Sequence, residues 1–378
     1  MEVKPGYKQT KVGVIPEEWE EARLAAVCSM KSGEGITNAN IDQFSEYRCF
    51  GGNGLRGFTS RFTHDGSYAL IGRQGALCGN VLGVEGRFFA SEHAIVVTAF
   101  ARTDIRWLTY VLGEMRLNQY SESSAQPGLS VTKLLNLDLA LPPTKDEQSA
   151  IAGALSDVDE LIGALDQLIA KKRDLKQAAM QQLLTGQTRL PGFHGKWEVK
   201  TLQESTDCLD SARVPLNEAQ RAQMKGDYPY CGANGVLDYV NGYVIDDDII
   251  LIAEDGGYFD EYEHRPIAYR MSGKCWVNNH AHILRAKEGF DQGFLFYSLV
   301  HKNILRFLAS GTRAKLNKSE MWKVEVNVPM ALPEQTAIAE VLSDMDAELA
   351  ALEQRRNKTR ALKQGMMQEL LTGRVRLV

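Results

Sequence analysis

The chain has 378 residues, of which 44% are hydrophobic, so it exceeds the usual size of a single hydrophobic core and should fold into two or more domains. No apolar stretch approaches the roughly 20 residues of a membrane span, and the opening MEVKPGYKQTKVG lacks the apolar core of a signal peptide, so we expect a cytoplasmic protein without membrane contact. The six cysteines show no C-x-x-C spacing, which argues against a disulfide framework or a ribbon-type zinc site, and the net charge of −5 means that any DNA-binding face must be local.

The first globular segment, residues 1–144, reads as a small α/β domain. YALIG (68–72) and AIVVTAF (94–100) predict strands, and DIRWLTYVLGEM (104–115) predicts an amphipathic helix. GGNG (51–54) contains Asn-Gly, the preferred pair for a tight turn with positive φ. Its glycines could instead admit a phosphate backbone, but no Gly-Lys-Ser/Thr follows and the Rossmann spacing is absent, which favours the turn.

A polar segment, SAQPGLSVTKL (124–134), predicts a loop ahead of a strand. Gln, Ser, Thr and Lys side chains donate to phosphates and read base edges. A solvated loop is the alternative, and this segment alone does not exclude it. The candidate DNA contacts of the first globule are Asn53, Arg56, Arg73, Gln74, Gln126, Ser130, Thr132 and Lys133.

A long helix is predicted next, over residues 145–187. Its apolar residues step by four and three, as in a heptad seam: Ile151, Leu155, Val158, Ile162, Leu165 and Ile169. Pro143 precedes the helix and Gly186 follows it. About 37 residues give a rod of roughly 55 Å, which needs a neighbour. A second apolar row lies beside the first: Leu161, Leu168, Leu175, Ala179 and Leu183. This row could bind another protein or pack on the globular parts.

The second globular segment, residues 188–331, has the same plan. DIILIA (248–253) and KVEVNVP (323–329) predict strands, and QGFLFYSLVHKNILRFLAS (292–310) predicts an amphipathic helix. GANG (232–235) repeats the turn signal.

The polar loop also returns, as SGTRAKLNKSEMWK (310–323), and here it predicts a basic patch. The patch holds Arg313, Lys315 and Lys318, and with Arg306 and Lys323 it outweighs Glu320. The candidate DNA contacts of the second globule are Asn234, Arg313, Lys315, Asn317, Lys318 and Ser319.

Enzyme and metal signatures are weak. Asp246–Asp248, Glu254 and Asp255 could suggest a metal, but their counterparts in the first globule are His64, Asp65, Gly66, Arg73 and Gln74. Surface acids, or residues that read cytosine amino groups, fit better. His93 and His280 occupy equivalent places without a repeated catalytic partner, so a structural hydrogen bond is expected. The sequence contains no P-loop, nucleophile elbow, or Asn/Asp-Pro-Pro-Tyr motif of the amino methyltransferases, which predicts a non-catalytic chain without metal or cofactor.

The last segment, residues 332–378, predicts a second long helix that copies the first. Its seam is Ile338, Leu342, Met345, Leu349 and Leu352, with Pro333 before the helix and Gly373 after it. EQSAIAGALSD (147–157) returns as EQTAIAEVLSD (334–344), and LKQAAMQQLLTG (175–186) returns as LKQGMMQELLTG (362–373), both 187 residues later. His93 meets His280 at the same offset, whereas the Asn-Gly turns lie 181 residues apart, which predicts about six inserted residues between them.

A period this long excludes a solenoid and indicates a duplicated domain pair. Lys176, Gln177, Thr185 and Gly186 recur as Lys363, Gln364, Thr372 and Gly373, polar or small residues that core packing would not fix. Their recurrence favours a partner on the helices. The candidate partner-binding residues are Leu168, Leu175, Met180, Leu183, Leu362, Met366 and Leu370.

Together these motifs resemble the specificity subunit of type I restriction-modification systems. The resemblance rests on LPPTKDEQSAIA (141–152) with LLTGQTRL (183–190), and on ALPEQTAIA (331–339) with LLTGRVRL (370–377), each after a globule that begins near G-x-I-P-x-x-W or its counterpart. It covers essentially the whole chain. The helical halves carry the specific motifs, and the globular halves are variable in such families.

The resemblance implies two target recognition domains joined by two long antiparallel coiled-coil helices in a pseudo-two-fold repeat. Each domain would read one half of a split, asymmetric double-stranded DNA target. Two methylation subunits that use S-adenosylmethionine would dock on the helices, and a restriction subunit that uses ATP and Mg could join them. The chain end RVRLV would lie near the chain start.

Two half-sites must be met at a set distance and rotation, because B-DNA turns once per 10 to 10.5 bp, about 34 to 36 Å. Rods of roughly 55 Å are stiff enough to set such a spacing. Two alternatives stay open at this point. One is a coiled-coil scaffold that never touches DNA, and the other is an orphan recognition subunit of a methyltransferase without restriction.

Overall fold

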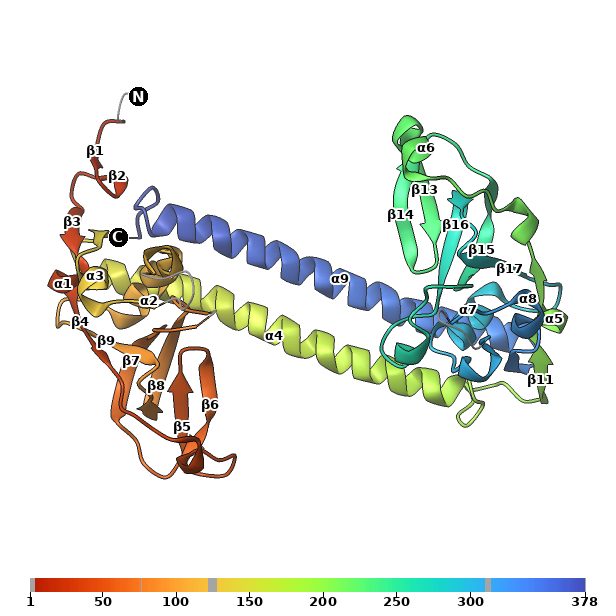
Figure 1. Ribbon diagram of the computed structural model, residues 1–378, viewed down its shortest axis with the longest axis horizontal. Helices are drawn as coiled ribbons and strands as arrows, with labels where there is room; N and C mark the ends of the chain where they lie inside the picture. Colours follow the sequence, from red (N-terminus) through yellow and green to blue (C-terminus); the bar gives the residue numbers. More distant parts are fainter. Residues whose placement is uncertain (1–3, 76, 122–127, 310–313, 378) are drawn as a thin grey trace. The chain divides into compact units, whose positions relative to one another are not determined.

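The computed structural model describes residues 4–75, 77–121, 128–309 and 314–377 (Figure 1). It divides into two compact units. Unit 1 comprises Met1–Asp166 with Arg355–Val378, and unit 2 comprises Gln167–Gln354. None of the helices in the described ranges combines the length and hydropathy that a bilayer span needs.

Unit 1 begins with a β-hairpin and contains one six-stranded sheet of order β4-β9-β7-β8-β5-β6. Its elements are β1 (Tyr7–Thr10), β2 (Gly13–Pro16), β3 (Glu20–Arg23), α1 (Leu24–Val27), β4 (Cys28–Ser32), η1 (Asn38–Asn40), β5 (Tyr47–Gly51), β6 (Gly54–Thr59), β7 (His64–Gly72), β8 (Val81–Ala90), β9 (Ala94–Ala99), α2 (Ile105–Glu114), η2 (Leu117–Tyr120), α3 (Val131–Leu135), β10 (Asp138–Leu141) and the first part of α4 (Lys145–Leu183). The last part of α9 completes the unit.

Unit 2 contains a second six-stranded sheet, of order β12-β17-β15-β16-β13-β14, which matches the first sheet strand for strand. Its elements are β11 (Trp197–Thr201), α5 (Leu202–Ser205), β12 (Thr206–Cys208), η3 (Asp210–Ala212), α6 (Glu218–Gln223), β13 (Lys225–Gly232), β14 (Gly235–Val240), β15 (Ile245–Ala253), η4 (Phe259–Glu261), β16 (Ala268–Val277), β17 (Ala281–Ala286), α7 (Gln292–Val300), η5 (Leu305–Phe307), α8 (Lys318–Met321), β18 (Glu325–Pro329) and α9 (Leu332–Leu370). The six-residue insertion predicted from the sequence falls between β15 and β16.

The central strand of each sheet contributes apolar side chains to both faces, and successive side chains of a strand point to opposite sides. On β7, Ala69 and Ile71 join the core that includes Trp107 of α2, whereas Leu70 packs with Phe88 on the other face. On β15, Ile250 and Ile252 belong to one core and Ile249 and Leu251 to the other. The central strands β7 and β15 are therefore largely buried on both faces, whereas the outer strands β6 and β14 expose Leu55, Leu237 and Tyr239.

The helix that covers one face of each sheet starts in the same way. Asp104 accepts hydrogen bonds from the amides of Arg106 and Trp107 at 2.8 and 3.1 Å, which caps α2. Asp291 accepts one from the amide of Phe294 at 2.8 Å, which caps α7. An aspartate at this position satisfies amide donors that have no partner within the helix.

The long helices pair antiparallel within each unit, as the family resemblance implied. α4 and α9 have 39 residues each, so each is roughly 58 Å long. In unit 1, Asp159 pairs with Lys363 at 2.6 Å and the later Asp166 with the earlier Arg360 at 2.8 Å. In unit 2 the ion pairs run the same way: Lys172 meets Glu348 and the later Lys176 meets the earlier Asp346.

The repeated sequence motifs tie the start of one long helix to the tail of the other. In unit 1, Glu147 near the start of α4 is buried and binds the guanidinium of Arg376 beyond the end of α9. In unit 2, Glu334 near the start of α9 is buried and binds Arg189 beyond the end of α4. The two ion pairs occupy equivalent positions in the two copies. We call each of them the buried Glu–Arg pair.

The neighbouring glutamine has the same role in both copies. The side chain of Gln148 accepts from the amide of Asp104 at 2.8 Å and donates to the carbonyl of Pro142. The side chain of Gln335 accepts from the amide of Asp291 at 2.8 Å and donates to the carbonyl of Pro329. Buried backbone groups need partners, so this glutamine fixes each long helix to its own globule.

The chain end lies beside the chain start within unit 1. The hydroxyl of Tyr7 donates to the carbonyl of Arg374 at 3.2 Å, and Arg376 pairs with Glu18 at 3.0 Å. This confirms the expected closeness of the two ends for these residues.

Four local predictions need correction. The helix predicted over 292–310 ends at Val300, because the side chain of Asn303 accepts from the amide of Leu305 and replaces a helical bond, and a short 3₁₀ turn follows. The polar segments predicted as loops contain α3 and α8, which start after Ser130 and Asn317. Pro333 lies inside the first turn of α9, where its missing N–H costs no helical bond.

Candidate nucleic-acid interface

Three backbone hydrogen bonds join the loops at the end of β7 in unit 1. The amide of Arg73 donates to the carbonyl of His93 at 2.9 Å, and the amide of Leu129 donates to the carbonyl of Arg73 at 2.9 Å. The amide of Ser91 donates to the carbonyl of Phe50 at 2.8 Å. These bonds bring the β5–β6 turn, the β8–β9 turn, the end of β7 and the segment before α3 together. We call this region the unit 1 loop edge.

Unit 2 repeats the three bonds at the equivalent residues. The amide of Glu254 donates to the carbonyl of His280 at 2.9 Å, the amide of Leu316 donates to the carbonyl of Glu254 at 2.7 Å, and the amide of Asn278 donates to the carbonyl of Cys231 at 3.0 Å. The equivalent region is the unit 2 loop edge. Its backbone frame matches that of unit 1, whereas Arg73 and Gln74 are replaced by Glu254 and Asp255.

Tight turns occur at the Asn-Gly motifs, as the sequence predicted, with the asparagine as the last residue of the turn and the glycine as the first residue of the next strand. Gly51 pairs with Gly54, and Gly232 pairs with Gly235, so each turn has two residues. The positive φ falls on the glycine after the asparagine, at 93° for Gly54 and 125° for Gly235. A side chain on Gly72 would meet the carbonyl oxygen of Gly52 at 2.4 Å, so this turn packs directly on the end of β7.

The candidate DNA contacts of unit 1 fall into two groups. Asn53 and Gln74 are exposed on the loop edge, and Arg56, Arg73 and Ser130 are half-buried there or beside it. Thr132 and Lys133 are exposed on α3. In unit 2, Asn234 is exposed on the edge, Lys315 is half-buried, and Asn317, Lys318 and Ser319 are exposed at the start of α8. Gln126 and Arg313 lie outside the described residues.

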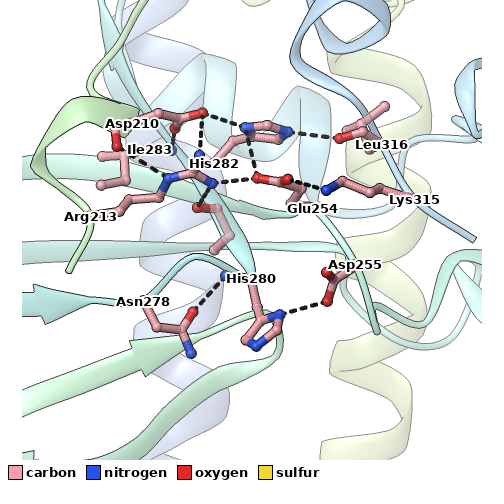
Figure 2. Close-up of polar contacts among 11 residues, drawn as sticks. Asp210, Arg213, Glu254, Asp255, Asn278, His280, His282, Ile283, Lys315 and Leu316 are labelled. Carbon is pink, nitrogen blue, oxygen red and sulfur yellow. Dashed lines mark hydrogen bonds and ion pairs between the residues drawn. The ribbon is translucent and has the colours of Figure 1, made fainter. Parts of the chain in front are cut away.

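A network of charged side chains connects the unit 2 loop edge to the sheet (Figure 2). Arg213 binds Glu254, which is 9% exposed, and Lys315 pairs with the other oxygen of Glu254 at 2.8 Å. Arg213 also lies 3.3 Å from Asp210. Burial acts to raise the pKa of Glu254, but the hydrogen bonds from Lys315 and Arg213 outweigh burial and hold that pKa below its usual value. The network thus ties the segment after Ala314 to the sheet.

His282 is the buried cation of this network. Its Nδ1 lies 2.6 Å from Asp210 and its Nε2 lies 2.8 Å from the carbonyl oxygen of Leu316. Burial would lower the pKa of His282, but the hydrogen bonds with Asp210, Cys208 and Leu316 raise it to about 9. Cys208, Asp210 and His282 place three possible metal-ligand atoms within 4.8 Å of one another. Because both ring nitrogens face oxygen acceptors, the arrangement fits a charged imidazolium better than a ligand.

The two histidines of the loop edges act mainly through their backbone. Their carbonyl groups accept the equivalent bonds from Arg73 and Glu254. Their side chains differ: His93 lies 3.4 Å from Glu92, and His280 lies 2.7 Å from Asp255. The structural role expected for His93 and His280 fits these contacts.

Among the described residues of the basic patch predicted in unit 2, three of the four cations have carboxylate partners. Lys315 pairs with Glu254, Arg306 pairs with Glu325 at 3.1 Å, and Lys323 pairs with Glu320 at 2.6 Å. The sequence showed Glu320 beside Lys323, but it did not show that the fold brings Glu254 to Lys315 and Glu325 to Arg306. Lys318 is exposed and lies over the ring of Trp322.

The acids of unit 2 do not form one cluster. Asp247 and Asp248 lie near the start of β15 and pair with Arg285 and Arg270, at 3.0 and 2.8 Å. Glu254 and Asp255 follow the end of the same strand. The first set therefore belongs to the sheet, and only the second set belongs to the loop edge. The strand register aligns Asp246–Asp248 with residues 65–67, so the counterparts expected from the sequence were wrong by one residue.

The candidate partner-binding residues on the long helices also separate. Leu168, Leu175 and Leu362 are 39%, 47% and 59% exposed, and Met180 and Met366 are half-buried. Leu183 and Leu370 are instead buried in the cores of unit 2 and unit 1, where they contribute to packing. The exposed leucines form part of an apolar helix surface outside the two cores. The recurrence of Lys176 and Lys363 does not require a partner, because they pair with Asp346 and Asp159 of the other long helix. Gly186 and Gly373 recur because both have positive φ, at 73° and 71°.

Comparisons with known proteins agree with this organisation. The family described as type I restriction modification DNA specificity domain matches residues 16–171 and 194–360. The EcoprrI type I restriction enzyme specificity subunit of Escherichia coli is 43% identical over 168 residues, which is 43% of this chain and 42% of that protein. A putative type I specificity subunit of Haemophilus influenzae is 36% identical over 158 residues, 42% of this chain and 39% of that protein.

A solved structure supports the fold across the whole chain. The type I restriction-modification S subunit from M. genitalium superposes with a TM-score of 0.75 at 16% identity and covers 98% of both chains. The matches to the Escherichia coli and Haemophilus influenzae subunits span only about two fifths of those relatives.

Proposed function

Since this chain belongs to the type I restriction-modification DNA specificity family, we propose that it is the non-catalytic subunit that recognises a split, asymmetric DNA target. The observation that carries the proposal is the pair of loop edges. Each has the same three backbone bonds, while the side chains at the equivalent positions differ.

A fixed backbone frame with variable side chains suits a surface that reads sequence. Phosphate contacts position a protein on DNA, whereas side chains at base edges specify the bases. Arg73 and Gln74 offer hydrogen-bond donors in unit 1, whereas Glu254 and Asp255 at the equivalent places are acids in unit 2. Two chemically different edges should therefore recognise two different half-sites.

The partners follow from the same proposal. Two methylation subunits would bind the exposed faces of the long helices, at Leu168, Leu175 and Leu362. These subunits would supply S-adenosylmethionine, and a restriction subunit that uses ATP and Mg could join them. This chain would then contribute recognition and assembly only.

The test is selection of binding sites from random double-stranded DNA by this chain assembled with its methylation subunits. We expect recovery of one gapped motif with two unlike halves. Affinity for that motif should fall steeply as salt rises, because phosphate contacts release counterions. Recovery of no motif, or an affinity that salt leaves unchanged, would instead support a scaffold that does not bind DNA.

A further inference from the structure

We infer that Arg73 determines one base of the half-site read by unit 1, by donating two hydrogen bonds to a guanine. The inference rests on the proposed function and names a residue and a base within it. It starts from the orientation and the charge environment of the guanidinium.

The guanidinium of Arg73 is oriented without being neutralised. One NH group donates to the hydroxyl of Ser32 at 2.9 Å. No ion pair of Arg73 occurs within the described part of the chain. The acids of neighbouring loops have other partners: Glu34 pairs with Arg61 at 3.0 Å, and Glu92 lies 3.4 Å from His93 and accepts from the amide of Ile36. The charge of Arg73 is therefore available to a ligand.

The backbone of Arg73 is held in place more firmly than that of a free loop residue. It follows β7 directly and exchanges backbone bonds with two other segments, through His93 and Leu129. The Gly52 turn packs against the last residue of the same strand. Side chains that read bases must be pre-positioned to gain specificity, and this frame provides the positioning.

In unit 2 the equivalent residue is Glu254, which contacts other residues of the protein and is not available to a ligand. Glu254 is buried and binds Arg213 and Lys315, so its carboxylate faces the protein. Glu254 is thus a positioning residue for the segment that carries Lys315. Lys315 is a cation of the unit 2 loop edge, and it stands where unit 1 has Gly128. The two edges therefore place their cations at different points of one frame.

Guanine is the base that fits an uncompensated guanidinium. Its major-groove edge presents two acceptors, O6 and N7, and paired N–H donors of arginine match them. A phosphate would also attract Arg73, but that contact would carry no sequence information. The two possibilities give different results in the experiment below.

The experiment uses the full chain with its methylation subunits and a random DNA library. For Arg73→Ala we expect one position of one half-site to lose its guanine preference, with affinity for the original motif about 5- to 150-fold weaker. The salt dependence of binding should change little. For Arg73→Gln we expect the same position to shift toward adenine, because a glutamine side chain pairs with adenine N6 and N7.

The matched control is Arg87→Ala. Arg87 is an exposed arginine of unit 1, but it pairs with Asp65 at 3.1 Å, so we expect the motif to stay unchanged. Thermal melting of each variant reports whether unit 1 is folded.

If Arg73→Ala weakens binding to all DNA sequences uniformly and lowers the salt dependence of binding, the inference is overturned in favour of a phosphate contact. An unchanged motif, or a wild-type motif without guanine, would overturn it as well. Failure of the wild type to select any gapped motif would contradict the proposed function instead.

Discussion

Replacing Arg189 by alanine should lower the free energy of unfolding of unit 2 by about 3–5 kcal/mol. The reason is the environment of Glu334, whose side chain is 1% exposed and whose two carboxylate oxygens both bind Arg189. Without the guanidinium, a buried carboxylate loses its counterion, and burial of an unpaired charge is among the costliest changes in a fold. Denaturant unfolding of the variant and of the wild type measures the difference.

Two further variants separate the charge effect from general damage. Glu334→Gln in the Arg189→Ala background should recover much of the loss, because a neutral amide costs less to bury. Lys172→Ala removes a cation from the exposed pair with Glu348, and this change should cost less than about 1 kcal/mol. If Arg189→Ala lowers the free energy of unfolding no more than Lys172→Ala does, the stabilising role of the buried Glu–Arg pair is contradicted. Arg376→Ala tests the equivalent pair of unit 1, through Glu147.

The sequence predicted the parts of the fold that depend on local periodicity. The heptad steps from Ile151 and from Ile338 gave both long helices to within a few residues, because a 3.5-residue repeat persists over many turns. The Asn-Gly pairs also indicated both tight turns, because the conformation of a tight turn depends on a few neighbouring residues. The short helices α3 and α8 were missed because segments of five and four residues carry no periodic signal.

The candidate sites were predicted by residue type but not by partner. Glu147 and Glu334 begin a segment that recurs in the two copies, yet the sequence could not show that each binds an arginine beyond the end of the other helix, 229 and 145 residues away in the chain. The basic patch of unit 2 was overestimated for the same reason, since Glu254 and Glu325 are distant in sequence from the cations that they neutralise.

The network around His282 left no signal in the repeat. The equivalent residue of unit 1 is Ile95, a buried residue of β9, so comparison of the two copies points away from a charged group. Asp210 and Arg213 lie about 70 residues earlier and meet His282 and Ala281 only through the fold of the sheet. The charged network of unit 2 therefore involves a position at which the two copies differ in residue type.

The charge on His282 should make the stability of unit 2 depend on pH between about 6.5 and 9. The raised pKa means that the folded state binds a proton more tightly than the unfolded state. The stabilisation is therefore complete below the unfolded value of about 6.5 and is lost as the pH rises through about 9. A pKa difference of this size corresponds to a free energy on the order of 3 kcal/mol.

The measurement is the free energy of unfolding of the wild type and of His282→Gln at several pH values. We expect their difference to be largest near pH 6 and to shrink steadily toward pH 10. His93→Gln, at an exposed histidine of unit 1, should show no comparable trend. If the stability difference between wild type and variant stays constant over this range, His282 is neutral in the folded state.

Because Nε2 of His282 is hydrogen-bonded to the carbonyl of Leu316, loss of the proton should also loosen the segment that carries Lys315. Amide hydrogen exchange at Leu316, whose N–H donates to Glu254, should then rise over the same pH interval by more than the intrinsic base catalysis of exchange.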